Sequence, residues 1–216
     1  MNENFRDFLS EVMPIQFKEP LAETLGAFTD AETILEYSFI DAIKMAGHVC
    51  PTVTGAYLCC QKAVKSLYPD KIPVRGEIGI TVYGEADEGV FGVIGHVLSL
   101  LTGAAPQTGF RGLGHRFRRK DLLNFIPEKI DEEALCFEFK RLDNKNKVLI
   151  KFYPQRVPFS VEKSERMGEL LEKVLWEAAK DKEKEEFQDL WMEKVKLMII
   201  EKKEIQKWLQ LEERSD

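Results

Sequence analysis

The spacing of apolar residues changes twice along the chain, and this restricts the fold class more than any other feature. Up to Leu67, apolar residues recur mainly at the spacing of one helix face. From Val74 the segment VRGEIGITVYG alternates apolar with polar or small residues, which indicates a strand. The runs ALCFEFKRL and KVLIKFYPQ flank DNKN and predict a β-hairpin. Helical spacing returns after Val161, so we expect an α+β fold, with helices packed on a small mixed or antiparallel sheet and a C-terminal helical arm.

Proline, glycine and capping residues mark the ends of the expected helices. We expect a short amphipathic helix within residues 2–13, and Asp30 is placed to cap a helix over AETILEY. The run YSFIDAIKMA ends at Gly47, a residue suited to the left-handed conformation that follows many helices. Two more helices are expected, one over residues 51–67 with a proline in its first turn and one over residues 89–103.

The C-terminal segment predicts two helices, over residues 161–180 and 183–213. The second carries a broad apolar stripe with two tryptophans, made of Phe187, Leu190, Trp191, Val195, Met198, Ile199, Ile205, Trp208 and Leu209. Such a stripe seldom stays exposed. The arm therefore either pairs with a second copy or packs back on its own sheet, and both alternatives stay open. We expect a core over residues 1–158 and a helical extension over residues 159–216.

Composition narrows the class of protein. The chain of 216 residues is 44% hydrophobic and 31% charged, with a formal net charge of −6. That balance argues against a nucleic-acid binder, which needs an excess of Lys and Arg along one face. No apolar run reaches the roughly 18 residues of a membrane span, and the first residues lack the layout of a signal peptide. Four cysteines, two of them adjacent, form no disulfide framework in a chain this long, so we expect a cytoplasmic protein.

The stretch GHVCP places a histidine and a cysteine two positions apart, directly before a helix that starts with proline. At Cys50 the positive end of the helix dipole favours a thiolate, and His48 can share a ligand with it. Together they supply two of the donors that a zinc-type site requires. The alternative is a Cys50 that packs as a small hydrophobe beside a capping His48. His96, which interrupts the apolar helix VFGVIGHVLSLL, is the expected third donor, with His115 as the next candidate.

The other three cysteines are expected to pack in the core. Cys59 and Cys60 are adjacent in a helix and point to different faces, so they can hardly bind one ion together. Free cysteine is common in protein cores. Cys136 alternates with phenylalanines in a strand and is assigned to the core for the same reason.

A glycine-rich, basic loop follows at GFRGLGHRFRR. Its three glycines permit unusual backbone angles, and loops in which N–H and guanidinium groups converge bind carboxylate or phosphate. We therefore expect Thr108, Arg111 and His115 to bind an anionic substrate, with a solvated basic loop as the alternative. In the acidic turn EADEG, Asp87 or Glu88 is the expected general base on a metal-bound water.

The stretch GHVCPTVTGAYL resembles the Gly-His-x-Cys-Pro motif, followed by a glycine-containing helix, of the formylmethanofuran dehydrogenase E-subunit-like family. The order of strand, acidic turn, apolar helix ending in Thr-Gly and basic loop is similar too, over residues 35–155. The resemblance implies an α+β core, homodimerisation, and a centre of zinc or another divalent transition metal at His48 and Cys50. The chain departs from the family by lacking a cysteine after the apolar helix and a C-terminal cysteine-rich zinc finger, and His96 stands where relatives often carry an acid.

Two functions follow from these features. The first is a metal-binding enzyme or accessory factor that acts on a small anionic or one-carbon-carrier substrate. The second is a non-catalytic binding or assembly protein with a structural metal site and a dimerising helical arm. No phosphate loop, dinucleotide fingerprint or nucleophile-elbow serine favours another class. We expect neither nucleic acid nor a membrane among the partners.

Overall fold

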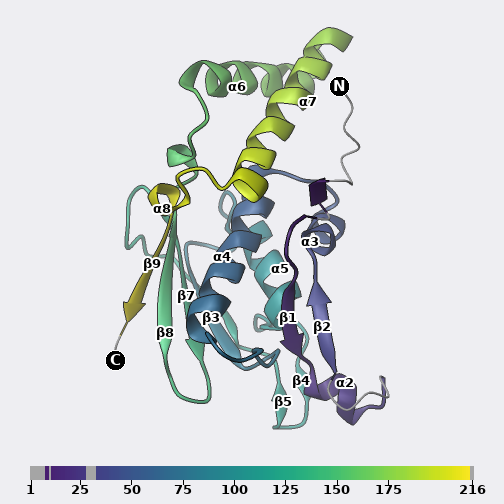
Figure 1. Cartoon of the computed structure of the whole chain (residues 1–216), viewed down its shortest axis with the longest axis vertical. Coiled ribbons are helices and arrows are strands. Elements are labelled where there is room, and N and C mark those ends of the chain that lie inside the picture. Colours follow the sequence, from purple (N-terminus) through teal and green to yellow (C-terminus); the bar gives the residue numbers. More distant parts are fainter. Residues whose placement is uncertain (1–7, 10, 28–32, 215–216) are drawn as a thin grey trace.

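The computed structural model describes residues 8–9, 11–27 and 33–214. One side of the molecule is a mixed sheet of β3 (Ile78–Tyr83), β6 (Leu123–Ile126), β7 (Leu135–Arg141), β8 (Lys147–Phe152) and β9 (Leu209–Arg214). The strand order is β6-β3-β7-β8-β9, with β3 and β6 parallel and the other neighbours antiparallel. Figure 1 shows β7, β8 and β9 on one side of the molecule. The predicted hairpin around DNKN is formed by β7 and β8. The predicted α+β class is confirmed.

Local signals mark the ends of the three helices of the core. α3 (Phe39–Ala46) follows a capping box at Ser38 and ends at Gly47 in the left-handed conformation. α4 (Pro51–Leu67) starts at its proline, and α5 (Phe91–Thr102) ends at Gly103, again left-handed. α4 and α5 pack against each other, and both contact the sheet. This arrangement buries α4 on nearly all sides and makes it the centre of the core.

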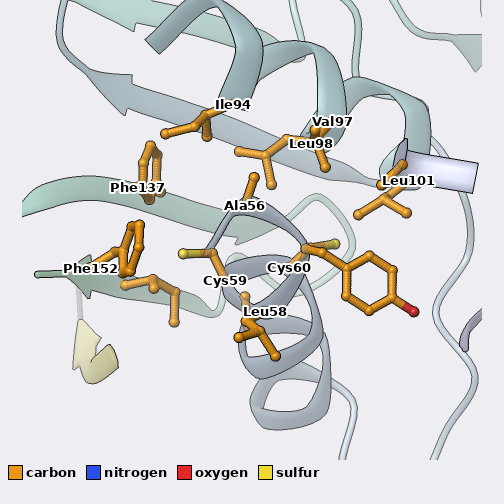
Figure 2. Close-up of a cluster of buried hydrophobic side chains, with 14 of the residues drawn as sticks. Ala56, Leu58, Cys59, Cys60, Ile94, Val97, Leu98, Leu101, Phe137 and Phe152 are labelled. Atoms are coloured by element: carbon orange, nitrogen blue, oxygen red, sulfur yellow. The ribbon is translucent and has the colours of Figure 1, made fainter. Parts of the chain in front are cut away.

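Cys59, Cys60 and Cys136 lie in the core, as predicted. Figure 2 shows the sulfur atoms of Cys59 and Cys60 on different sides of α4, among apolar side chains of α5 and the sheet. Burial raises the pKa of both thiols, and it also raises the pKa of Cys136, to about 11. These thiols are therefore protonated and unreactive at neutral pH.

The C-terminal segment forms α6 (Val161–Leu175), α7 (Asp181–Lys196), a π-helical turn at Leu197–Glu201, α8 (Ile205–Trp208) and then β9. The prediction of helix through residue 213 is wrong from Leu209 onward, because β9 pairs with β8 along its free edge. Without that pairing, the edge of β8 would leave backbone N–H and C=O groups unpaired. The pairing explains why a segment with helical spacing becomes a strand.

Both tryptophans of the predicted stripe pack on their own chain. Trp208 is 0% exposed, and Trp191 donates its Nε1 hydrogen to the carbonyl of Val49 at 2.8 Å. Trp208 therefore packs on the sheet, against Phe152 of β8, as the second alternative has it, whereas Trp191 contacts the link before α4. At the end of α6, by contrast, Leu175 and Trp176 are 70% and 83% exposed. Homodimerisation through the arm stays a prediction.

Two small sheets complete the fold. β1 (Ile15–Lys18) pairs antiparallel with β2 (Ile34–Tyr37), and α2 (Pro20–Thr24) follows β1. The predicted helix over AETILEY is wrong for Ile34–Tyr37, because these residues form β2 and pair with β1. Asp30 and most of the helix predicted over residues 2–13 lie outside the described residues.

β4 (Gly112–Leu113) and β5 (Phe117–Arg118) form a hairpin at the end of the molecule opposite α6 and α7 (Figure 1). Within the described ranges, none of the helices combines the length and apolar character needed to cross a bilayer.

Candidate functional site

Cys50 caps α4, the role that the alternative interpretation of GHVCP assigned to its histidine. Its Sγ accepts the backbone N–H of Val53 at 3.3 Å, and the residue is 7% exposed in an extended backbone conformation. His48 is exposed, and its Nδ1 lies 2.9 Å from the carbonyl oxygen of Ala46. The motif thus starts the central helix, with its sulfur already engaged by the backbone.

The proposed third donor does not complete a metal site with this pair. His96 is exposed in the middle of α5, and His115 lies in the β4–β5 hairpin, far along the molecule from the start of α4. Among the described residues, no three His, Cys, Asp or Glu side chains come together as a metal centre requires. The described residues therefore offer no complete zinc site, and zinc binding stays a prediction.

Substitution of Cys50 by serine separates a metal role from a structural one. Serine caps helices well, so we expect Cys50→Ser to keep the fold and to lose any zinc bound through the thiolate. Elemental analysis of untagged protein would compare it with the wild type, with His48→Ala and with the control Cys136→Ala. Equal zinc content in all four proteins, or none in the wild type, would contradict the metal prediction.

A basic hollow lies beside the β4–β5 hairpin. It has a volume of about 390 Å³ and is lined by Arg111, Gly114, His115, Arg118, Lys120 and Asp121. The carboxylate of Asp121 pairs with Arg118 at 2.6 Å. Within the described part of the chain, the side chains of Arg111 and Lys120 have no ion-pair partner. The hollow therefore carries positive charge in a protein whose net charge is −6.

Two glycines of this hairpin have a left-handed backbone conformation. Gly112 has φ +85°, and a Cβ there would lie 1.9 Å from the carbonyl oxygen of Phe117, so only glycine fits. Gly114 has φ +57°. Gly109, the third glycine of the loop, has no positive φ. The unusual backbone angles expected for this loop are thus present at Gly112 and Gly114 and absent at Gly109.

The other predicted site residues lie outside the hollow. Thr108 is exposed in the turn before the hairpin and is not part of the lining. Asp87 and Glu88 are exposed in the turn before α5 and do not line it either. Their roles as substrate ligand and general base stay predictions. Of the predicted residues, the structure brings together Arg111 and His115.

Beneath the hairpin lies a buried charge cluster that joins three distant parts of the chain. Glu19 accepts a hydrogen bond from Arg119 Nη2 at 2.6 Å on one carboxylate oxygen and one from Arg75 Nη1 at 3.0 Å on the other. Glu19 is 6% and Arg119 is 2% exposed. Burial lowers the pKa of Arg119, and the neighbouring Glu19 carboxylate opposes that shift.

Arg75 ties this cluster to the end of α5. Its Nε and Nη2 donate to the carbonyl oxygens of Leu101 and Leu100 at 3.2 and 2.8 Å. Its guanidinium also lies 5.1 Å from the centre of the Tyr37 ring, a cation–π distance. Sequence reasoning missed the cluster, because no local pattern connects a glutamate near the start of the chain with arginines so far along it.

Comparison of the chain with models of known protein families gives no match, and comparison with curated proteins gives none. The resemblance to the formylmethanofuran dehydrogenase E-subunit-like family stays a prediction from the GHVCP motif. The function is therefore inferred from the geometry of the chain's own side chains.

Proposed function

We propose that the protein binds a small anionic ligand, bearing a phosphate or carboxylate group, in the basic hollow. The observation that supports this is the convergence of Arg111, Arg118 and Lys120 on one hollow with a single carboxylate, already paired. Guanidinium groups bind such anions through two parallel hydrogen bonds, and an ammonium adds a compact charge. His115 supplies a further ring N–H.

The lining also limits the class of ligand. The hollow is lined by charged and polar side chains and one glycine, so no apolar side chain is there to hold a hydrophobic group. Binding must then come from charge-assisted hydrogen bonds, which favours a compact, strongly charged anion over a large organic one. The proposal concerns binding, and it holds for an enzyme or an accessory protein of cytoplasmic one-carbon chemistry alike.

Titration with inorganic phosphate at low salt tests the proposal. We expect Arg111→Ala and Lys120→Ala each to weaken phosphate binding about tenfold, because each removes one charge-assisted hydrogen bond. Isothermal calorimetry of the full chain would measure the affinities.

Arg116→Ala is the matched control for this titration. Arg116 belongs to the same hairpin, but its guanidinium lies 5.0 Å from the centre of the Phe117 ring and does not line the hollow. It should leave phosphate binding close to that of the wild type. An equal loss in all three variants would mean that only net charge matters, and no binding by the wild type would overturn the proposal.

A further inference from the structure

The segment that runs from β5 (Phe117–Arg118) to Lys120 carries two of the hollow's cations with a buried arginine between them. Arg118 and Lys120 line the hollow, whereas Arg119 is 2% exposed and points into the protein. This alternation is that of an extended strand, in which successive side chains lie on opposite faces. The place of Arg119 in the interior therefore determines where its two neighbours lie.

Backbone hydrogen bonds extend this dependence to the third cation. The backbone N–H of Arg119 donates to the carbonyl oxygen of Arg111 at 3.1 Å, and the carbonyl oxygen of Arg119 accepts from Ala105 at 3.0 Å. Leu122 in turn donates to the carbonyl of Ala105 at 3.1 Å. Arg111, Arg118 and Lys120 are thus all one residue or one hydrogen bond away from Arg119.

Two glycines leave the space that the guanidinium of Arg119 occupies in the interior. A Cβ on Gly103 would lie 2.0 Å from Arg119 Nη1, and a Cβ on Gly76 would lie 2.4 Å from Arg119 Cζ. Both glycines have positive φ, +74° and +85°. The guanidinium therefore occupies space that any other residue at either position would fill.

Glu19 supplies the charge that keeps this guanidinium inside. Burying an arginine is costly unless it is paired and hydrogen-bonded, and Glu19 is the carboxylate that pairs with both Arg119 and Arg75. Arg119 Nη1 is buried without a hydrogen-bond partner, so the side chain depends on its Nη2 contact with Glu19. Removing the negative charge would leave the buried guanidinium of Arg119 and the partly buried one of Arg75 without the carboxylate that pairs with both.

We infer that Glu19, acting through Arg119, is a positioning residue for the anion site, an inference that rests on the proposed function. Glu19 does not line the hollow. It determines where Arg111, Arg118 and Lys120 stand, and a binding site loses affinity when its supporting contacts are loosened.

Phosphate titration of Glu19→Gln at a temperature where it is folded tests this role. We expect binding to weaken about tenfold although every lining side chain is intact. Arg119→Lys, which keeps the charge and one contact with Glu19, should recover part of the affinity lost in Arg119→Met. Ile150→Ala, which truncates a fully buried side chain in β8, is the control for lost stability. It should bind phosphate like the wild type.

Hydrogen exchange gives a second readout that does not depend on phosphate. In Glu19→Gln the amides of Arg119, Ala105 and Leu122 should exchange faster at constant global stability. If these amides or the phosphate affinity stay unchanged in Glu19→Gln, or if Ile150→Ala loses as much affinity, the positioning role is wrong. If the wild type binds no phosphate while the amides of Glu19→Gln are released, the proposed function fails, and Glu19 supports only the hairpin.

Discussion

Replacing Trp208 by alanine is expected to lower the free energy of unfolding by about 3–5 kcal/mol, the usual cost of removing a fully buried tryptophan. Trp208 is 0% exposed, and its ring packs against Phe152 with the ring centroids 6.2 Å apart. Its Nε1 donates to the carbonyl oxygen of Lys203 at 2.9 Å, and its own carbonyl accepts from Tyr153 at 2.8 Å.

The same contacts hold the turn that leads into β9. Lys202 and Glu204 adopt left-handed backbone, with φ +48° and +52°, which costs free energy for residues with a side chain. Without the Trp208 ring, that strain is no longer offset, so we expect the amides of Leu209–Arg214 to exchange faster than those of β7 in Trp208→Ala.

Urea unfolding followed by circular dichroism would measure the loss, since the substitution removes a fluorophore. Trp176→Ala is the matched control, because Trp176 is 83% exposed and its removal should change stability by less than about 0.5 kcal/mol. Equal stability of the two variants would show that the C-terminal segment does not depend on Trp208.

The parts of the fold that could be predicted from the sequence are those set by local chemistry. Gly47, Pro51 and Gly103 mark helix ends because left-handed backbone and the missing proline N–H act within a few residues. β9 could not be predicted in this way. Its segment has helical spacing, and only the free edge of β8, distant in sequence, makes a strand the better solution.

The same distinction, between local chemistry and tertiary contacts, decides which parts of the candidate site could be predicted. Arg111 and His115 stand out because the glycines and bases around them form a local pattern. The role of Lys120 emerges only from the structure, in which β5 ends at Arg118 and Lys120 bridges to Ala105, so that Arg118 and Lys120 line the hollow and Arg119 does not. The pairing of Glu19 with Arg119 depends on tertiary structure alone, and no spacing in the sequence contains it.

Replacing Gly103 by alanine is expected to lower the free energy of unfolding by at least about 3 kcal/mol, because it disturbs a buried ion pair. The added Cβ would lie 2.0 Å from Arg119 Nη1 and 3.0 Å from Arg75 Cγ, so the guanidinium must leave its place beside Glu19. Left-handed backbone adds a cost of its own, about 1–2 kcal/mol for a residue with a Cβ.

Gly47 offers a control with the same backbone. It also follows a helix with φ +74°, as Gly103 does, but a Cβ there would meet nothing within 4 Å. Gly47→Ala should therefore lose only the cost of the left-handed conformation, about 1–2 kcal/mol. The difference between the two variants in urea unfolding isolates the displacement of Arg119. Phosphate titration should show weaker binding for Gly103→Ala alone, and equal stability losses in the two variants would mean that the hairpin accommodates a moved guanidinium without cost.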